Sequence, residues 1–343
     1  MEIDGRKIGP GHPPYIIAEM SNNHLGSLER AKKIIKSAKD AGADAVKVQT
    51  YDADALTMDS AKTDFIIHTP LWKGETYYQL YKKSALPLEH TKALFDYARE
   101  IGITLFSSPF DRKAIDLLMG LNCPAFKIAS FESIDPYFLK CIAQTGKPVL
   151  MSTGISSFDE IAMSMSVLKE NNAKEILLFH CISKYPALVE DYNLSALNRL
   201  KKFSGLVGLS DHSLDDTAAL SSIAMGGCAV EKHFTLSRQE GGPDAAFSIE
   251  EVQMRNLKKN CQKVWNSVGS PEVLDREDRP GKEHARSLYI TCDVNTGERL
   301  SNENIRSIRP GYGLSPVFFD DVMGKRFNQK IDAGTALKWE YLS

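Results

Sequence analysis

Two histidines, His212 and His233, stand at the polar ends of short apolar runs and could together hold a metal ion. His212 lies in Gly208-Leu209-Ser210-Asp211-His212-Ser213, and His233 lies in Val230-Glu231-Lys232-His233-Phe234. An apolar run that ends in polar residues is typical of a buried parallel strand whose last residues reach a site. Neutral imidazoles are the commonest metal ligands. Either histidine alone is better explained as a hydrogen-bonded residue near a strand end, but the pair favours a metal with open positions for water and substrate.

Lysines and serines at other strand ends predict a site for an anion. The residues concerned are Lys47, Lys127, Ser130, Ser152 and Ser210. Ammonium and hydroxyl groups bind phosphate oxygens, and charge-assisted hydrogen bonds are the strong ones. A lysine at a barrel strand end can instead form a Schiff base, which needs a depressed pKa. Two phosphate-facing lysines are the simpler interpretation in a ring of serines.

Two carboxylates complete the chemistry that these residues suggest. Glu19 ends an apolar run, and Glu132 closely follows another. Carboxylates in such places can move protons or hold hydroxyl groups. Together with a metal and an anion site, they suit carbon–carbon bond formation between a phosphorylated anion and an aldehyde.

Eight strand-then-helix units are predicted to position these side chains. We expect strands at 15–21, 44–50, 104–109, 125–130, 148–153, 176–181, 206–213 and 228–234, and helices at 28–41, 90–101, 112–119, 135–144, 158–170, 194–202, 215–225 and 249–268. A doubly wound sheet usually has fewer strands and a Gly-rich fingerprint, and no GxGxxG occurs here. The alternation predicts a (β/α)8 TIM barrel whose active site lies at the carboxyl ends of the strands.

The predicted strand ends are more polar than a packed core would be. The residues there are Glu19, Lys47, Gln49, Ser108, Lys127, Ser130, Ser152, Ser183, Ser210, His212 and His233. The repeated serines and lysines could also act as support around a smaller site. A long connection at 51–89 follows the second strand and is rich in aromatic residues, which is more often functional than idle. The alternative is a surface excursion packed by its own aromatics.

The chain divides into three parts by composition. Residues 1–268 form the predicted barrel, residues 269–284 are polar and charged and read as a linker, and residues 285–343 form a small β-rich domain. We expect strand-like structure at 286–291 and 293–298 and a helix start at 301–304. A core this small is marginal alone, so the domain is expected to dock on another surface.

Bulk composition excludes several classes of protein. The chain is 43% hydrophobic and 25% charged with a formal net charge of −2 and no basic run, which argues against nucleic acid as a partner. No apolar stretch is long enough to span a bilayer, and no signal peptide is apparent. Six cysteines are scattered without CxxC spacing, which indicates a reducing cytoplasm.

Several motifs in order resemble the sialic acid synthase family. They are Ile17-Ala18-Glu19-Met20-Ser21-Asn22-Asn23-His24, Lys47-Val48-Gln49-Thr50-Tyr51, Ser107-Ser108-Pro109-Phe110, Lys127-Ile128-Ala129-Ser130-Phe131-Glu132, Ser152-Thr153-Gly154, Ser210-Asp211-His212 and Glu231-Lys232-His233-Phe234. The segment from Ala285 to Gly311 looks like the antifreeze-like (SAF) domain of that family. The resemblance spans nearly the whole chain.

The resemblance implies a metal-dependent condensation of phosphoenolpyruvate with an open-chain amino sugar and release of phosphate. Members of the family are dimers in which the C-terminal domain of one subunit covers the barrel mouth of the other. By matching motif, His212 and His233 hold Mn²⁺ or Mg²⁺, and Glu19 is the acid/base. Phosphoenolpyruvate is held by Lys47, Ser108, Lys127, Ser130, Ser152, Ser183 and Ser210. The sugar or the metal's waters meet Gln49, Glu132, Tyr185 and Asp244, and Arg309 reaches into the partner's site. Ser183 departs from the asparagine of some members.

Within the family, two segments resemble the pseudaminic acid branch. They are Phe65 to His90, which includes Leu71-Trp72, and Gly242 to Ser248. The sugar implied is 2,4-diacetamido-2,4,6-trideoxy-L-altrose, whose methyl and acetamido groups suit an aromatic-rich connection. A legionaminic or N-acetylneuraminic acid synthase is the nearest alternative. A metal-dependent barrel hydrolase would normally need more metal ligands than two histidines. A non-catalytic glycan-binding protein would be expected to lack the polar residues at the strand ends, which are intact here.

Overall fold

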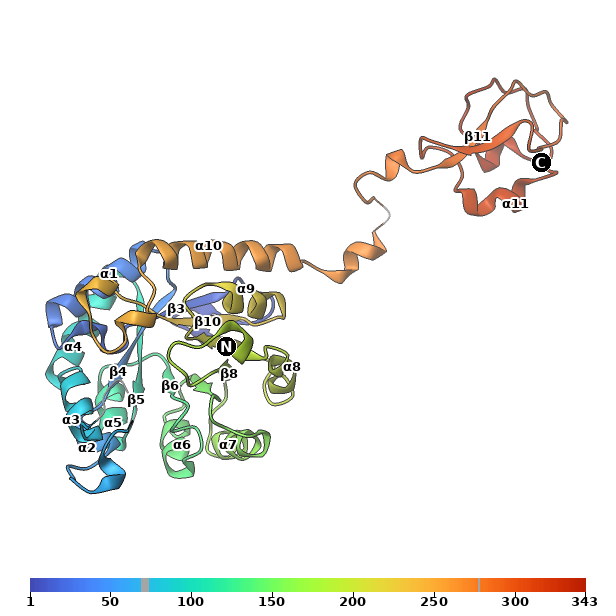
Figure 1. Ribbon diagram of the computed structural model, residues 1–343. Helices are drawn as coiled ribbons and strands as arrows, with labels where there is room; N and C mark the ends of the chain where they lie inside the picture. Colours follow the sequence, from blue (N-terminus) through green and yellow to red (C-terminus); the bar gives the residue numbers. More distant parts are fainter. Residues whose placement is uncertain (69–73, 277) are drawn as a thin grey trace. The chain divides into compact units, whose positions relative to one another are not determined.

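Eight parallel strands close into a barrel in the first part of the chain (Figure 1). The computed structural model describes residues 1–68, 74–276 and 278–343 and divides into two units, Met1–Gly269 and Ser270–Ser343. The barrel strands are β3 (Tyr15–Glu19), β4 (Ala45–Thr50), β5 (Thr104–Pro109), β6 (Phe126–Ile128), β7 (Val149–Ser152), β8 (Ile176–Cys181), β9 (Val207–Asp211) and β10 (Ala229–His233). They pair in chain order, and β10 pairs with β3 to close the barrel. The predicted TIM barrel is confirmed.

Helices follow the strands at the predicted places. The main ones are α1 (Leu28–Asp40), α4 (Leu88–Ile101), α5 (Arg112–Gly120), α6 (Pro136–Ala143), α7 (Phe158–Glu170), α8 (Ala196–Leu200), α9 (Thr217–Ala224) and α10 (Glu251–Val268). Local sequence fixes their starts, because Ser27 and Asp111 accept hydrogen bonds from the backbone N–H groups of Arg30 and Ala114. The apolar face of α1 buries Ile34 and Ile35 against the barrel.

The long connection after β4 contains short elements of its own. They are α2 (Ala53–Leu56), a 3₁₀ turn at Thr63–Phe65 and α3 (Tyr77–Ser84). Tyr51 packs edge-to-face against Tyr81 and Phe110, with ring centroids 6.3 and 5.3 Å apart. Leu71 and Trp72, which carried part of the branch resemblance, lie outside the described residues.

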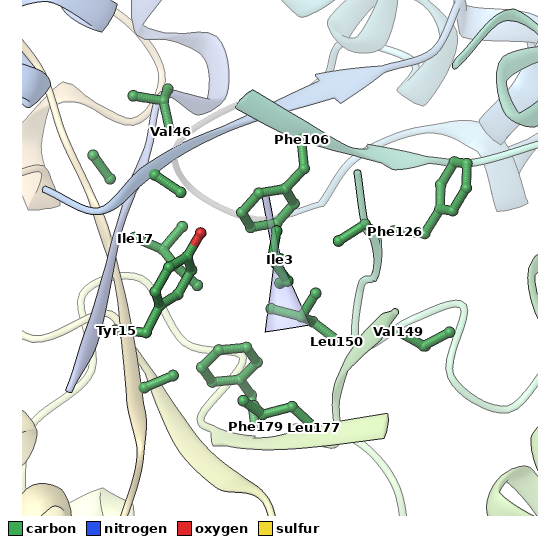
Figure 2. Packing of buried hydrophobic residues seen from close by; sticks show 14 of the residues in the cluster. Ile3, Tyr15, Ile17, Val46, Phe106, Phe126, Val149, Leu150, Leu177 and Phe179 are labelled. Carbon is green, nitrogen blue, oxygen red and sulfur yellow. The ribbon is translucent and has the colours of Figure 1, made fainter. Parts of the chain in front are cut away.

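A hairpin at the N-terminus, which the sequence patterns did not reveal, lies at the amino ends of the barrel strands. Strands β1 (Glu2–Ile3) and β2 (Arg6–Lys7) pair antiparallel, and the N-terminal ammonium lies 3.3 Å from Glu175, just before β8. Ile3 is buried in the barrel core, where Figure 2 shows it near Phe106 and Leu150. A strand of two residues has no measurable periodicity, which explains why it was missed.

The C-terminal unit has its own small core. Strands β11 (Ser287–Ile290) and β12 (Ile305–Ile308) pair antiparallel, and α11 covers Phe319–Val322. Its buried residues include Leu288, Val294 and Phe327. Two expectations were wrong here. Residues 293–298 form a turn with one isolated bridge from Val294 to Ile331, and residues 301–304 form a turn closed by the Asn304 side chain, which accepts from Ser301 N–H. The segment before β11 contains 3₁₀ turns at Pro271–Asp275 and Lys282–His284.

Among the described residues, no helix is long and apolar enough to cross a membrane. The six cysteines all lie in the described ranges and all are free, five of them buried.

Candidate active site

The carboxyl ends of the barrel strands bring most of the predicted site residues together. Glu19, Lys47, Gln49, Ser108, Lys127, Ser152, Ser210 and His233 lie within the strands, and His212, Ser130, Ser183, Glu132, Tyr185 and Asp244 lie in the loops that follow. Residues two apart on a strand share a face, so Lys47 and Gln49 point to the same side, as do Glu231 and His233. Arg309 belongs to the second unit, where it is exposed after β12.

Four buried charges alternate across the barrel mouth. The Lys47 ammonium lies 3.0 Å from the Glu19 carboxylate and 3.5 Å from that of Glu231, and Lys127 lies 3.9 Å from Glu231. Each of the four side chains is less than 6% exposed. Glu231 belongs to one of the motifs that carry the family resemblance, but no role for it was predicted from the sequence. The structure places it between the two lysines, where it also accepts a hydrogen bond from Ser210 at 3.1 Å.

The pKa values of these groups shift in different directions. Burial favours neutral Lys47, but the Glu19 and Glu231 carboxylates outweigh it and raise the lysine's pKa. Burial also opposes the charge of Glu231, yet Lys127 and Lys47 lower its pKa. For Glu19, burial dominates over the nearby Lys47 and raises the pKa. Of the two carboxyl groups beside Lys47, Glu19 is therefore the one that more readily takes up a proton, which suits an acid/base role.

The two histidines lie side by side. Their ring centroids are 5.3 Å apart, and the Tyr185 ring packs 4.4 Å from that of His212. Burial lowers the pKa of both imidazoles, and that of His233 is lowered further by His212 and Lys47. Both rings are therefore neutral near pH 7, which is the form that binds metal.

The donor atoms available fit a metal ion held by two protein ligands. His212 Nδ1 lies 2.7 Å from the Ile182 carbonyl, which can only accept, so this nitrogen carries the proton and Nε2 is left as the ligand atom. The buried Nδ1 of His233 has no hydrogen-bond partner among the described residues and lies 3.9 Å from Asp244 Oδ2. No group of three or more His, Cys, Asp or Glu residues in the described ranges could hold a metal. Water and substrate would have to supply the other ligands.

A hydrogen-bonded chain joins Asp244 to Glu19. Gln49 donates from Nε2 to Glu19 at 2.9 Å and to Ser21 at 3.1 Å, and Ser21 donates to Asp244. Ser21 adopts a positive φ of 45°, which is strained for a residue with a side chain. Sequence reasoning missed Ser21, although it stands in the quoted motif directly after the first strand.

Serine hydroxyls surround Lys127 on the other side of the mouth. Lys127 donates to Ser152 Oγ at 2.5 Å, and Lys47 donates to Ser108 Oγ at 3.4 Å. Ser130 Oγ lies 3.0 Å from Cys181 Sγ and accepts from Gly154 N–H at 3.2 Å. Two lysines among hydroxyls and a backbone N–H are the donors that an organic phosphate needs.

Gly154 leaves the space between these hydroxyls open. A Cβ at this position would lie 2.5 Å from Ser183 Oγ, 2.6 Å from Cys181 Sγ and 2.9 Å from Ser130 Oγ. Gly154→Ala should therefore turn these side chains away from their present positions. We expect about tenfold weaker binding of an organic phosphate, because one or two hydrogen bonds of about 1 kcal/mol each are lost. Titration calorimetry with phosphoenolpyruvate would measure it. The control is Gly120→Ala at the end of α5, where nothing lies within 4 Å, and equal loss in both variants would contradict the prediction.

Glu132 has a buried carboxylate oxygen with no hydrogen-bond partner among the described residues. Burial raises its pKa to about 7. A polar group left without a partner in this way suits a ligand that brings one.

The raised pKa of Glu132 predicts how the free energy of unfolding depends on pH. Because its pKa in the folded protein exceeds the ordinary value of 4.5, the folded state binds more protons between about pH 4.5 and pH 7. This contribution is complete below pH 4.5 and is lost as the pH rises through 7. Glu132→Gln should be no more stable than wild type at pH 4.5 but about 3.5 kcal/mol more stable at pH 8, since one pKa unit is worth about 1.4 kcal/mol. Urea unfolding at both pH values measures it. Glu100→Gln, on the exposed end of α4, is the control, and an equal gain at both pH values would contradict the prediction.

Known proteins resemble this chain over almost its whole length. The NeuB family model matches residues 34–273, and the SAF domain model matches residues 285–343. A pseudaminic acid synthase from Campylobacter jejuni is 40% identical over 326 residues, covering 94% of this chain and 95% of that protein. An N,N'-diacetyllegionaminic acid synthase from Legionella pneumophila is 33% identical over 335 residues, covering 96% and 94%.

A solved structure shares the barrel. It is the N-acetylneuraminic acid (sialic acid) synthetase from Leptospira borgpetersenii in complex with citrate, with a TM-score of 0.72 and 28% identity. The match covers 82% of this chain and 93% of that one.

Proposed function

Because this chain belongs to the NeuB family and ends in a SAF domain, we propose that it is a pseudaminic acid synthase. The family resemblance read from the motifs is confirmed by the family match, and the chain is an enzyme of the transferase class. The substrates are phosphoenolpyruvate, 2,4-diacetamido-2,4,6-trideoxy-L-altrose and water. C3 of phosphoenolpyruvate forms the new bond to the aldehyde carbon, water adds to C2, and phosphate leaves from C2. The observation that carries this choice is the 40% identity, over nearly the full length of both chains, to a pseudaminic acid synthase.

The buried charges support the roles proposed for the residues that hold phosphoenolpyruvate. Lys47 and Lys127 bind its carboxylate and phosphate, and neither forms a Schiff base. Ser108, Ser130, Ser152, Ser183 and Ser210 bind the remaining oxygens. The carboxylate of Glu231 lies between the two ammonium groups and favours their charged forms, which supports this arrangement, although burial still lowers the pKa of Lys127.

The aldehyde end of the sugar lies beside the histidines in this proposal. A Mn²⁺ or Mg²⁺ ion held by His212 and His233 would polarise the aldehyde oxygen. Glu19 supplies the proton that this oxygen needs when the carbon–carbon bond forms, and its raised pKa favours that role. Gln49, Glu132, Tyr185 and Asp244 hold the sugar or the waters around the metal.

The alternatives are weaker on particular observations. The legionaminic acid synthase is 33% identical, against 40% for the pseudaminic acid synthase. A barrel hydrolase would need a fuller ligand set than the described residues contain. A binding protein without activity would have no use for the buried, alternating charges of Glu19, Lys47, Glu231 and Lys127.

One assay tests the proposed function. Phosphate release from phosphoenolpyruvate is measured with Mn²⁺ and each of three sugars, namely 2,4-diacetamido-2,4,6-trideoxy-L-altrose, 2,4-diacetamido-2,4,6-trideoxymannose and N-acetylmannosamine. We expect the altrose derivative to give the highest kcat/KM. A higher kcat/KM with either mannose derivative would mean that pseudaminic acid is not the main product. No phosphate release with any of the three sugars would overturn the proposal.

We further propose that the enzyme is a homodimer in which the SAF domain of one subunit covers the barrel mouth of the other. The small core of this domain supports a docked role, and so does its exposed aromatic surface at Tyr312, Phe318 and Trp339. Arg309 then contacts the sugar of the partner's site.

A further inference from the structure

A buried ion pair lies directly behind the histidine pair, on the outer side of the barrel. Lys232 Nζ donates to Asp211 Oδ2 at 2.7 Å, to the Asp215 carbonyl at 2.6 Å and to Ser213 Oγ at 3.4 Å. Asp211 and Lys232 are 0% and 1% exposed. Each is next in the chain to a histidine of the site, but alternation along a strand turns it to the opposite face. Nothing in the proposed chemistry uses this pair.

The second oxygen of Asp211 leads to Tyr192. This oxygen accepts hydrogen bonds from the Tyr192 hydroxyl at 2.9 Å and from Ser213 N–H and Oγ at 2.9 and 2.7 Å. The Tyr192 hydroxyl in turn accepts from the backbone N–H of His212 at 2.6 Å. A single hydroxyl, itself fully buried, therefore joins the ion pair to a metal-ligand candidate.

The loop after β8 surrounds His212 on three sides. Tyr192 bonds its N–H, Ala187 N–H donates to its carbonyl at 3.1 Å, and the Ile182 carbonyl accepts from its Nδ1 at 2.7 Å. All three partners come from residues 182–192, which also contain Ser183 and Tyr185. The two backbone hydrogen bonds therefore fix the position of the His212 main chain, and the bond to Ile182 fixes the orientation and tautomer of its ring.

A buried ion pair is weak evidence for stability, because apolar residues of similar size often serve as well. Its best-attested use is to specify one geometry. Here each group is fully hydrogen-bonded, and the two strands that it joins, β9 and β10, are those that present His212 and His233. The Ile182 carbonyl is the kind of outer partner that metal-binding histidines have, and Tyr192 holds the same residue through its backbone N–H. Removing an outer partner typically weakens metal binding 10–100-fold.

We propose that Tyr192, held by the Asp211–Lys232 ion pair, is a positioning residue for the metal ligand His212. Its hydroxyl connects the loop after β8 to the ends of β9 and β10 and so holds the His212 ring beside that of His233, at a centroid distance of 5.3 Å. This inference rests on the proposed metal site.

The test measures Mn²⁺ binding by the full chain without substrate. Free Mn²⁺ is followed by its electron paramagnetic resonance signal during titration of wild type, Tyr192→Phe and Tyr15→Phe. Tyr15 is also fully buried but begins β3 at the opposite end of the barrel, so Tyr15→Phe is the matched control. We expect about tenfold weaker binding in Tyr192→Phe and unchanged binding in Tyr15→Phe. Unfolding by urea must show both variants folded.

The outcomes separate this inference from the proposed function. If wild type binds Mn²⁺ and Tyr192→Phe binds it as tightly, or if Tyr15→Phe weakens it equally, only the positioning role is overturned. If wild type binds no Mn²⁺, the metal part of the proposed function fails and this inference fails with it. Should Tyr192→Phe not fold, Ser213→Ala removes one hydrogen bond each from Asp211 and Lys232. A loss of Mn²⁺ affinity in Ser213→Ala, smaller than the tenfold expected for Tyr192→Phe, supports the inference, and unchanged affinity overturns it.

Discussion

Replacing His233 by alanine should abolish metal-dependent turnover while leaving the protein folded. The imidazole ends β10, its pKa is lowered well below the ordinary value, and its Nδ1 is buried without a partner among the described residues. Losing one of two protein ligands should release the metal. Because the metal supplies several kcal/mol of charge stabilisation in the transition state, we expect kcat/KM to fall on the order of a thousandfold or more. Phosphate release at saturating phosphoenolpyruvate, with the sugar varied below its KM, measures it.

Metal binding and folding are measured on the same variant. Mn²⁺ affinity should fall with activity, and the urea midpoint should change little, because a ligand at the strand end is not part of the apolar core. His12→Ala is the control, since His12 is exposed in the segment before β3. If chelator-treated wild type keeps full activity without added metal, the metal role of both histidines is wrong.

The order of strands could be predicted because parallel barrel strands are buried on both faces. Runs such as Ile176–Cys181 are continuous and apolar, so their bounds agreed with the structure. The C-terminal unit was harder, because residues 293–298 and 301–304 carry turn-forming and strand-forming residues in close alternation. There the long-range bridge from Val294 to Ile331 decides the structure, and local sequence does not contain it.

The candidate site could be predicted in outline because polar residues at strand ends stand out against apolar runs. Alternation along β10 puts Glu231 on the face of His233 and Lys232 on the other, but it does not give the partners that each meets on the neighbouring strands. Glu231 faces the two lysines, whereas Lys232 faces Asp211 on the outer side. The role of Ser21 could not be predicted for another reason. It depends on a left-handed backbone conformation that brings the Ser21 hydroxyl to Asp244. Neighbouring strands, and not spacing within one strand, determine these contacts.

Arg309→Ala should lower the use of the sugar strongly while leaving phosphoenolpyruvate binding intact. Arg309 is exposed and forms no ion pair within the described residues, so its guanidinium is free to contact an acetamido oxygen or a carboxylate. The backbone after it is held firmly, because Ser287 Oγ donates to the Pro310 carbonyl at 2.6 Å and Gly311 N–H donates to the Glu283 carbonyl at 2.9 Å. Loss of a charged hydrogen bond in the transition state costs about 1.5–3 kcal/mol, or roughly 10- to 100-fold in kcat/KM for the sugar.

The subunit that receives Arg309 can be identified by mixing two defective variants. His233→Ala keeps an intact Arg309, and Arg309→Ala keeps an intact barrel. The linker of residues 269–284 could reach at most about 50 Å when extended, which is enough to cross to a neighbouring subunit. After subunit exchange in a 1:1 mixture, half of the dimers are mixed, and in each of these one of the two sites combines an intact barrel with the partner's Arg309. About a quarter of wild-type activity should therefore return. The control is a mixture of His233→Ala with His212→Ala, whose mixed dimers contain no intact barrel and should stay inactive. If exchange is demonstrated by mass spectrometry and no activity returns in the first mixture, Arg309 does not act in the partner's site.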